Sequence, residues 1–432
     1  MTSSMSRTPC KIPAMKGFEQ KSYVGLKAAL YNVRTYPFGS TEVACRAVLI
    51  VSNGLRTILV ACQLQRSDSA ILSSINAREV FLVPSKPAVP PMPSKTAKPV
   101  IDQPLQISRR ARRNRKSPTQ RAAFQETNIS PENLIYPLFI HQGEVDIPIK
   151  TMPGRYMLGW RHGLIEEVAR ARDVGVNSIV LYPKVPDALK SPTGEEAFND
   201  NGLVQRTVRL LKDKFPDLVI YTDVNFDEYS LSGHGGIIRE DGVILNDETI
   251  HQLRKQAISQ ARAGADVVCT SEMLDGRVGA VRAALDAEGF HHVSIMSYSV
   301  KYTSSLYGRF RKVELDKKTY QINPANSREA LIEAQEDEAE GADILMVKPA
   351  VPSLDIIRLL KDQTLLPVGA CQVSGEYSMI KAAGLLKMID EEKVMMESLI
   401  CLRRAGADLI LTYFALQAAT VLCGEHRKFV FD

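Results

Sequence analysis

The chain has 432 residues, a net charge of +5 and a hydrophobic content of 45%. This length allows one large domain with appendages or two to three ordinary domains, and the apolar content excludes a chain that is disordered throughout. Seven widely spaced cysteines without a CxxC pair exclude a disulfide scaffold and a four-cysteine zinc site, and they favour a reducing compartment. The longest apolar region, Val43 to Leu64, is interrupted by Arg46, Asn53 and Arg56, so we expect no membrane span.

Most of the positive charge lies at the N-terminus. Residues 1–100 contain 13 Lys and Arg against 4 Asp and Glu, and they include 12 Ser, whereas the rest of the chain contains 41 basic and 45 acidic residues. A basic, serine-rich, acid-poor N-terminus predicts an organelle transit peptide over residues 1–83, and the alternative is a disordered tail without an address. Residues 84–108 are rich in Pro, Lys and Ala, which predicts an extended linker.

The next segment, residues 109–133, opens with the basic run RRARRNRK at 109–116. Such a run can bind nucleic acid or mark a nuclear signal. Here no aromatic residue interleaves with the basic ones, no nucleic-acid reading module follows, and the body of the chain is slightly acidic, so we expect no nucleic-acid partner. The favoured interpretation is an N-terminal arm that pairs with an acidic neighbouring subunit.

From residue 134 to residue 432, short apolar segments alternate with helical periodicity. Continuous apolar strands separated by amphipathic helices predict a parallel sheet that is covered on both faces. Eight such strands in about 300 residues predict a closed (β/α)8 barrel, the TIM-barrel fold. A doubly wound open sheet is the alternative, although the chain has no GxGxxG or GxxxxGK[ST] phosphate loop. The expected strands are Leu134–Ile140, Ser178–Leu181, Leu218–Thr222, Val267–Thr270, Val293–Tyr298, Ile344–Val347, Val368–Cys371 and Leu409–Thr412.

A short internal repeat supports the barrel. The phrase Ala-Gly-Ala-Asp precedes expected strands at 263–266 and 405–408, a near copy lies at 340–343, and a looser copy lies at 173–176. Each glycine follows an amphipathic helix, so each can end that helix in the left-handed conformation. The repeat therefore marks the end of a helix and the start of the next buried strand.

Two lysines at the ends of two expected strands form the most informative pair. In a barrel of this kind the active site lies at the C-terminal ends of the strands. Lys301 closes SIMSYSVK and Lys348 closes ADILMVK. Partial burial and a second ammonium nearby both lower the pKa of a lysine, so a neutral amine becomes available to attack a ketone. The alternatives are two snorkelling lysines, or one active lysine beside a structural one. The other polar residues at strand ends are Asp223, Ser271, Glu272, Ser374 and Tyr413.

Long segments between residues 109 and 427 follow the order of a known family. Among them are YPLFIHQGE at 136–144, KSPTGEEAFNDNGL at 190–203, SIMSYSVKY at 294–302, LMVKPA at 345–350 and QVSGEYSMIKAA at 372–383. On these segments the chain closely resembles the plant-type 5-aminolevulinate dehydratases (porphobilinogen synthases). The resemblance implies a (β/α)8 barrel with an N-terminal arm that embraces a neighbour, a homo-oligomer that is usually an octamer, and a place in the chloroplast stroma.

The resemblance also implies a hydro-lyase reaction. Two molecules of 5-aminolevulinate per subunit condense to porphobilinogen, with loss of two waters, as an early step of tetrapyrrole biosynthesis. Lys348 matches the lysine that holds the P-side substrate as a Schiff base, and Lys301 matches the lysine of the A-side Schiff base. The iminium then acidifies the adjacent carbon, and the resulting enamine can attack the other carbonyl.

Further positions match the substrate-binding residues of the family. Arg311 and Lys317 match the basic pair that grips the A-side carboxylate. Ser374 and Tyr413 match the hydroxyls that hold the P-side carboxylate. For the two basic residues, the alternative is a pair of solvated lid charges.

Three acidic residues complete the set that the resemblance implies. Asp223 and Asp275 are candidates for proton handling and for binding the substrate amine. Glu333 matches the glutamate of an allosteric magnesium site. One carboxylate with waters and a neighbouring subunit suits Mg²⁺, which keeps much of its hydration. Without the resemblance, Glu333 is an ordinary solvent-facing acid.

The chain departs from the family near the expected site. Zinc-dependent relatives carry three cysteines where this chain has Asn225, Asp227 and Gly235, so no cysteine zinc site can form. Glu272 stands where the family usually has Asp. Cys371 stands where the family usually has Tyr.

The lid segment at 307–318 is several residues shorter than usual for the family, which could loosen A-side binding and the exclusion of solvent. Three interpretations follow. The chain is an active dehydratase, or a catalytically impaired relative that assembles as a structural or regulatory subunit, or another lysine-dependent barrel such as a class I aldolase. The third requires only one Schiff-base lysine.

Overall fold

The structure is a computed structural model, and it describes residues 27–38, 41–52, 55–64, 107–307 and 317–424. The chain divides into two compact units, one up to Ser108 and one from Arg109 onward. Arg311 and most of the predicted transit peptide and linker lie outside the described residues. None of the helices in these described ranges is long and apolar enough to cross a membrane.

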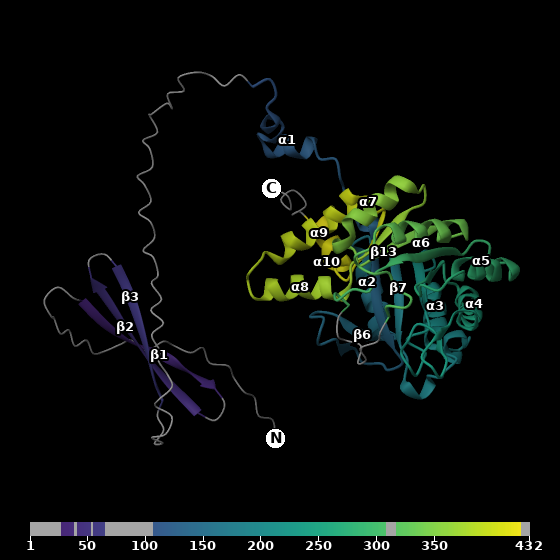
Figure 1. Cartoon of the computed structure of the whole chain (residues 1–432), viewed down its shortest axis with the longest axis horizontal. Coiled ribbons are helices and arrows are strands. Elements are labelled where there is room, and N and C mark those ends of the chain that lie inside the picture. Colours follow the sequence, from purple (N-terminus) through teal and green to yellow (C-terminus); the bar gives the residue numbers. More distant parts are fainter. Residues whose placement is uncertain (1–26, 39–40, 53–54, 65–106, 308–316, 425–432) are drawn as a thin grey trace. The chain divides into compact units, whose positions relative to one another are not determined.

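The first unit contains a three-stranded antiparallel sheet in the order β1–β2–β3 (Figure 1). Its strands are β1 (Lys27–Phe38), β2 (Thr41–Ser52) and β3 (Leu55–Leu64). The sheet falls within the segment where the composition predicts a transit peptide. The transit peptide and the linker stay predictions.

The second unit is built on eight parallel strands that close into a barrel. Neighbouring strands pair in the order β4, β7, β8, β11, β12, β13, β14, β15, and β15 pairs with β4 through Ile410–Leu134 and Leu411–Ile135. The prediction of a (β/α)8 barrel is therefore confirmed, and closure excludes the doubly wound open sheet. The strands are β4 (Leu134–His141), β7 (Ser178–Lys184), β8 (Val219–Val224), β11 (Val267–Thr270), β12 (Ser294–Lys301), β13 (Ile344–Lys348), β14 (Val368–Cys371) and β15 (Leu409–Leu411).

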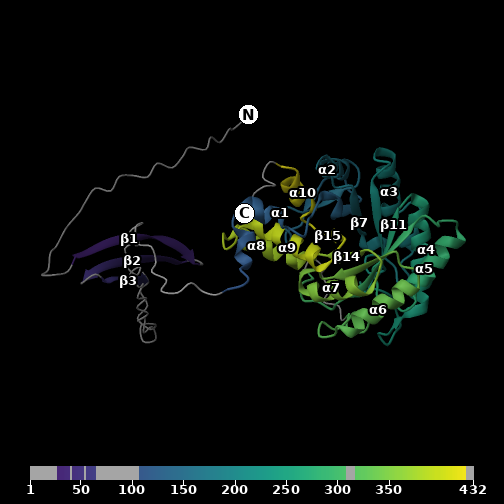
Figure 2. The ribbon, with the colours of Figure 1, turned by 90° about the horizontal axis from the view of Figure 1, so that it is seen from above.

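Helices surround the strands, as Figure 2 shows from above. Most connections consist of one helix, but β14 and β15 are joined by two, α8 and α9, which pack against each other. The α-helices are α1 (Pro118–Ala123), α2 (His162–Asp173), α3 (Leu203–Lys214), α4 (Asn246–Ala263), α5 (Arg277–Ala287), α6 (Arg328–Ala339), α7 (Leu354–Gln363), α8 (Ser374–Leu385), α9 (Glu391–Ala405) and α10 (Ala415–Cys423). The short 3-10 helices are η1 (Ala111–Arg115), η2 (Pro131–Asn133), η3 (Asp187–Leu189), η4 (Glu195–Phe198) and η5 (Val351–Ser353). The short strands outside the barrel wall are β5 (Ile147–Pro148), β6 (Tyr156–Gly159), β9 (Ile237–Ile238) and β10 (Ile244–Leu245).

The aspartates of the repeat link neighbouring strands at the N-terminal end of the barrel. The carboxylates of Asp266, Asp343 and Asp408 each accept the backbone N–H of a residue near the start of the preceding barrel strand, at 2.7, 2.7 and 2.8 Å. The glycines of the same three copies have φ values of +107°, +101° and +124°, which an L side chain would strain. The repeat thus combines a helix end with a strand-to-strand hydrogen bond.

Two apolar clusters show which face of each strand points inward. One cluster draws on all eight barrel strands and includes no helix residue, so it fills the barrel interior, whereas the other joins the strands to the helices. The members of the interior cluster are Ile135, Val180, Tyr221, Val267, Cys269, Met296, Tyr298, Ile344, Met346, Cys371, Val373 and Leu411.

A register irregularity in β12 changes which residues of that strand point inward. Tyr298 belongs to the interior cluster, yet Val300, two residues on, packs on the helix side. Between Ser297 and Val300 the pairing of β12 with β13 shifts by one residue. An extra residue in one strand reverses the alternation of side chains beyond it. After the shift, Lys301 pairs directly with Lys348.

Candidate active site

The two lysines meet at the C-terminal mouth of the barrel. Lys301 ends β12, Lys348 ends β13, and their α-carbons are direct partners in the ladder. Neighbouring strands lie about 4.8 Å apart, so the two side chains leave the barrel wall side by side. The structure therefore brings together the pair that the strand-end pattern singled out.

Lys301 lies in a buried, charged environment. Its side chain is 8% exposed, its ammonium donates a hydrogen bond to the carbonyl of Ser271, and its Nζ lies 3.9 Å from Oε2 of Glu272. The pKa of Lys301 is lowered to about 8, mainly by burial; Glu272 opposes this shift, and the positive charges of Lys348 and Lys317 contribute to it. A lysine with this pKa is about one-tenth neutral amine at pH 7, far more than a lysine with the ordinary pKa of about 10.4.

Lys348 lies close to two aromatic rings. Its Nζ is 5.4 Å from the ring centroid of Tyr298 and 5.4 Å from that of Tyr307, within the range of cation–π attraction. The hydroxyl of Tyr298 in turn lies 3.1 Å from that of Tyr182. The strand-end pattern did not single out these aromatic residues. A period-two reading of SIMSYSVK would have placed Tyr298 on the inward face, and that was the available signal.

Asp223 lies near the end of β8, within the electrostatic range of both lysines. It is 7% exposed and accepts a hydrogen bond from the side-chain amide of Asn225. Burial raises the pKa of Asp223, whereas a hydrogen bond from Ser271 and the charges of the lysines lower it. A buried carboxyl with these opposing influences is suited to exchange protons.

Lys317 is the first described residue after the gap at 308–316, and it lies near the mouth of the barrel. Its Nζ lies 3.0 Å from Oδ2 of Asp227, and both side chains are largely buried. The charge of Lys317 acts on the pKa of Lys301, which places Lys317 near the lysine pair. Arg311, its expected partner in gripping a carboxylate, lies outside the described residues.

Ser374 and Tyr413 lie beyond the ends of the next two strands around the barrel. Ser374 is the first residue of α8, two residues beyond Gln372, and is 4% exposed. Tyr413 follows β15 and stacks on Phe139 with 5.8 Å between ring centroids and 10° between ring planes. Both therefore lie on the same end of the barrel as the lysines.

Asp275 acts electrostatically on Glu333, and the groups that influence Glu333 most do not include the lysine pair. Asp275 is exposed, and its backbone exchanges two 3.0 Å hydrogen bonds with the side chain of Asn246. Glu333 lies in α6, and burial raises its pKa to about 7, while Arg277 lowers it and Asp275 adds to the rise. Within the described ranges no three His, Cys, Asp or Glu residues are arranged to hold a metal ion.

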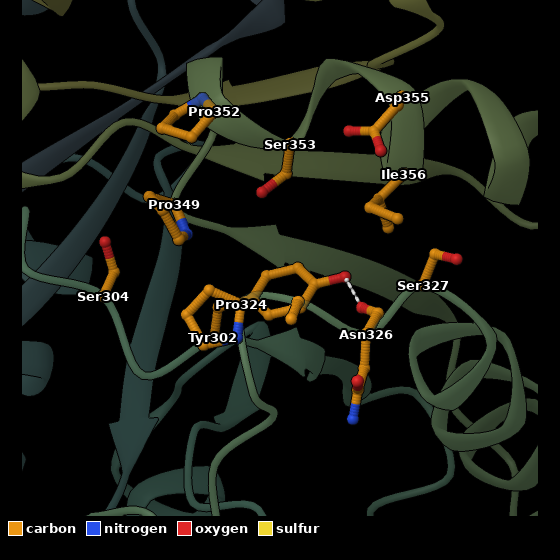
Figure 3. A pocket seen from close by; sticks show the side chains of 11 residues that line it. Tyr302, Ser304, Pro324, Asn326, Ser327, Pro349, Pro352, Ser353, Asp355 and Ile356 are labelled. Atoms are coloured by element: carbon orange, nitrogen blue, oxygen red, sulfur yellow. Dashed lines mark hydrogen bonds between the residues drawn. The ribbon is translucent and has the colours of Figure 1, made fainter.

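Figure 3 shows a cavity of about 330 Å³, and the two lysines are not among the residues that line it. Tyr302 and Pro349, which directly follow the lysines, form part of its wall, and α7 contributes Asp355. The hydroxyl of Tyr302 donates a 2.7 Å hydrogen bond to the carbonyl of Asn326. The sequence pattern did not predict this cavity.

The comparisons with known proteins agree with this arrangement. The family model described as "Delta-aminolevulinic acid dehydratase" matches residues 108–421. The chain is 80% identical over 429 residues to the Arabidopsis thaliana protein named "Probable delta-aminolevulinic acid dehydratase 2, chloroplastic", covering 99% of each chain. It is 63% identical over 434 residues to the Arabidopsis thaliana protein named "Delta-aminolevulinic acid dehydratase 1, chloroplastic", covering 99% of this chain and 100% of that one.

A solved structure shares both the fold and much of the sequence. The Toxoplasma gondii delta-aminolevulinic acid dehydratase (porphobilinogen synthase), solved in complex with the reaction product porphobilinogen, superposes with a TM-score of 0.72 and 49% identity. The match covers 73% of this chain and 92% of that chain. The names of the plant relatives confirm the chloroplast location that the sequence predicts. The chain belongs to the delta-aminolevulinic acid dehydratase (porphobilinogen synthase) family, whose members are hydro-lyases.

Proposed function

We propose that the chain condenses two molecules of 5-aminolevulinate to porphobilinogen through Schiff bases on Lys301 and Lys348. The observation that carries this proposal is the direct pairing of the two lysines at the barrel mouth. Each ketone carbon accepts a lysine amine and loses its oxygen as water, which leaves an iminium that acidifies the adjacent carbon. Loss of a proton there gives an enamine whose carbon attacks the second substrate.

The surrounding residues support a division of roles. The rings of Tyr298 and Tyr307 beside Lys348 favour a cationic group at that nitrogen, which an iminium is. Buried Asp223, on which both lysines act electrostatically, is the proposed group that takes and returns the protons that the carbon atoms exchange. Lys317 supplies positive charge for a substrate carboxylate, with Arg311 as its expected partner.

Ser374 and Tyr413 are the proposed hydroxyl ligands of the P-side carboxylate, because both follow strands at the mouth. Asp275 is the exception among the proposed substrate-binding residues. Its described contacts are with Asn246, and its charge acts on Glu333. A role for Asp275 in binding the substrate amine stays a prediction.

The decisive experiment is reductive trapping. Purified protein is incubated with 5-aminolevulinate and borohydride, and the modified lysines are located by peptide mass. We expect substrate adducts on both Lys301 and Lys348 and formation of porphobilinogen without borohydride. An adduct on one lysine alone would favour a class I aldolase, and adducts without porphobilinogen would favour an impaired relative.

We also propose that Glu333 binds an allosteric Mg²⁺. Arg277 and the carboxylates of Asp337, Asp275 and Glu336 act on Glu333 in opposite directions, and Arg277 also pairs with Asp337 at 2.8 Å. Oxygen ligands of this kind suit Mg²⁺, which commonly keeps several waters and takes one or two carboxylates. A titration of activity with Mg²⁺ in metal-free buffer tests the proposal.

The proposed assembly is a homo-octamer held by the arm at 109–133. In that arm η1 and α1 contain no buried residue within their own chain, which favours a surface that another subunit covers. Analytical ultracentrifugation of the full chain and of a form lacking residues 109–124 provides the test. We expect the deletion to lower the mass of the assembly.

A further inference from the structure

The carboxylate of Glu272 is buried beside Lys301. Glu272 follows β11 and is 1% exposed. Neither of its side-chain oxygens has a hydrogen-bond partner in the described part of the chain. Among the described residues, Lys301 lies within ion-pair distance of it, with 3.9 Å between Nζ and Oε2. A buried carboxylate without a hydrogen-bond partner is costly, so its presence here points to a function.

Gly235 provides the space that this carboxylate occupies. A Cβ atom at Gly235 would lie 2.1 Å from Oε2 and 2.6 Å from Cδ of Glu272. The backbone does not explain the glycine, because Gly235 is absent from the described glycines with positive φ. The N–H of Gly235 donates a 3.3 Å hydrogen bond to the hydroxyl of Tyr320, which holds the loop in place. The glycine is therefore matched to the length of the glutamate side chain.

The other two carboxylates near Lys301, those of Asp227 and Asp223, have different partners. Asp227 pairs with Lys317 at 3.0 Å. Asp223 accepts hydrogen bonds from Asn225 and Ser271.

Tyr320, whose pKa is raised to about 12 mainly by burial, faces Glu272 as a neutral phenol. Lys348 is the second amine of the pair. In the described ranges, Glu272 is the carboxylate that lies within ion-pair distance of Lys301.

We propose that Glu272, accommodated by Gly235, is the proton-exchange partner of Lys301. The carboxylate accepts a proton from the Lys301 ammonium. The neutral amine then forms a C–N bond to the ketone carbon of the substrate as the C=O π bond opens, and one proton of the attacking nitrogen moves to the oxygen. The resulting carbinolamine hydroxyl then takes the proton back from Glu272, its C–O bond breaks, and water leaves. The products are a protonated Schiff base, one water and the regenerated carboxylate, with no change of oxidation state. This inference rests on the proposed Schiff-base role of Lys301.

A double-mutant cycle with a site-resolved readout tests the inference. The proteins are the wild type, Glu272→Asp, Gly235→Ala, the combination of the two, and Glu272→Gln. Each full-length protein is treated with 5-aminolevulinate and borohydride, and the rate of adduct formation is followed separately at Lys301 and Lys348. The rate at Lys348 reports whether the barrel is intact.

We expect Glu272→Gln to slow adduct formation at Lys301 by roughly a hundredfold, the usual effect of losing a general acid–base group, with little change at Lys348. In the protein that keeps Glu272, Gly235→Ala should strongly slow adduct formation at Lys301. In the Glu272→Asp background, where the side chain is shorter, it should slow adduct formation much less. This non-additivity is the signature of direct contact between the two positions.

Each contrary outcome has one reading. If the wild type forms adducts on both lysines and Glu272→Gln labels Lys301 at the wild-type rate, the inference fails and the proposed function stands. Equal effects of Gly235→Ala in the glutamate and aspartate backgrounds would also overturn it. If the wild type labels neither lysine, the proposed function fails and the inference fails with it. If Glu272→Gln loses labelling at both lysines, the cycle of Glu272→Asp, Gly235→Ala and their combination decides. Non-additive rates at Lys301 then support the inference, and additive rates overturn it.

Discussion

Lys301 and Lys348 are direct partners in the ladder between β12 and β13, and they reach that register only beyond the irregularity between Ser297 and Val300. In a regular strand, Lys301 would share a face with the other odd-numbered residues of β12 and point toward the helices, as Ile295 does. The irregularity turns the lysine inward. The proposed chemistry therefore depends on one extra residue in one strand.

Replacing Lys348 by Ala should abolish turnover. This amine lies 5.4 Å from the ring centroids of both Tyr298 and Tyr307, and no second lysine ends β13. A porphobilinogen assay of Lys348→Ala, with the exposed Lys393→Ala as a matched control, checks this. Activity of the Lys348 variant within about tenfold of the wild type would refute the role, since a covalent nucleophile contributes far more than that.

The reactivity of Lys301 should rise with pH through about 8, the value to which burial lowers its pKa. The neutral amine is the reactive form, so the reactive fraction is small below this pH and approaches its maximum above it. Competitive acetylation with trace acetic anhydride, followed by peptide mass analysis across pH, measures the midpoint. In urea-unfolded protein the same lysine should titrate near the ordinary value of about 10.4. A folded-state midpoint that coincides with the unfolded one would contradict the burial argument.

Lys317→Ala should raise KM for 5-aminolevulinate by roughly tenfold, because the variant loses a contact to the substrate carboxylate. A tenfold loss of affinity corresponds to about 1.4 kcal/mol. We expect kcat to change much less, since Lys317 does not carry the reacting atoms in the proposal. Steady-state kinetics on Lys317→Ala and on its exposed neighbour variant Lys318→Ala provide the comparison. An unchanged KM for the first variant would exclude the carboxylate-binding role.

Glu333→Gln should remove the response of activity to Mg²⁺ and leave the basal activity in place. The substitution keeps the shape of the side chain and removes the charge that a cation needs. Activity is measured against Mg²⁺ concentration, with the exposed Glu392→Gln in α9 as the control. Loss of all activity of Glu333→Gln at saturating Mg²⁺ would contradict an allosteric role.

Asp343→Ala should destabilise the barrel by about 1–3 kcal/mol, because the N–H of Ile295 loses its acceptor at the start of β12. Calorimetry should show a lower Tm for this variant. Asp286→Ala removes an exposed carboxylate that pairs with Arg282 within one helix, and it should change Tm much less. Equal shifts in the two variants would show that the repeat aspartate has no special structural role.

The alternation of apolar strands with amphipathic helices was enough to predict all eight barrel strands. The expected strand Val267–Thr270 agrees with β11 at both ends, and the expected strand Val293–Tyr298 ends three residues before β12 does. The missing part is the segment that contains the irregularity and Lys301. Periodicity weakens there because the alternation of inward and outward residues is interrupted.

The amino-acid sequence alone was enough to predict the barrel, the lysines at two strand ends and the plant chloroplast family. Apolar patterns and long motifs are local properties of the sequence, so they can be recognised without the structure. Only the tertiary structure decided that Lys301 turns inward beside Lys348, that Lys317 pairs with Asp227, and that Gly235 lies against Glu272. These relationships join residues that are 47, 90 and 37 positions apart in the numbering. Their contacts arise from strand register and barrel closure, which depend on the packing of the whole fold and on no single segment.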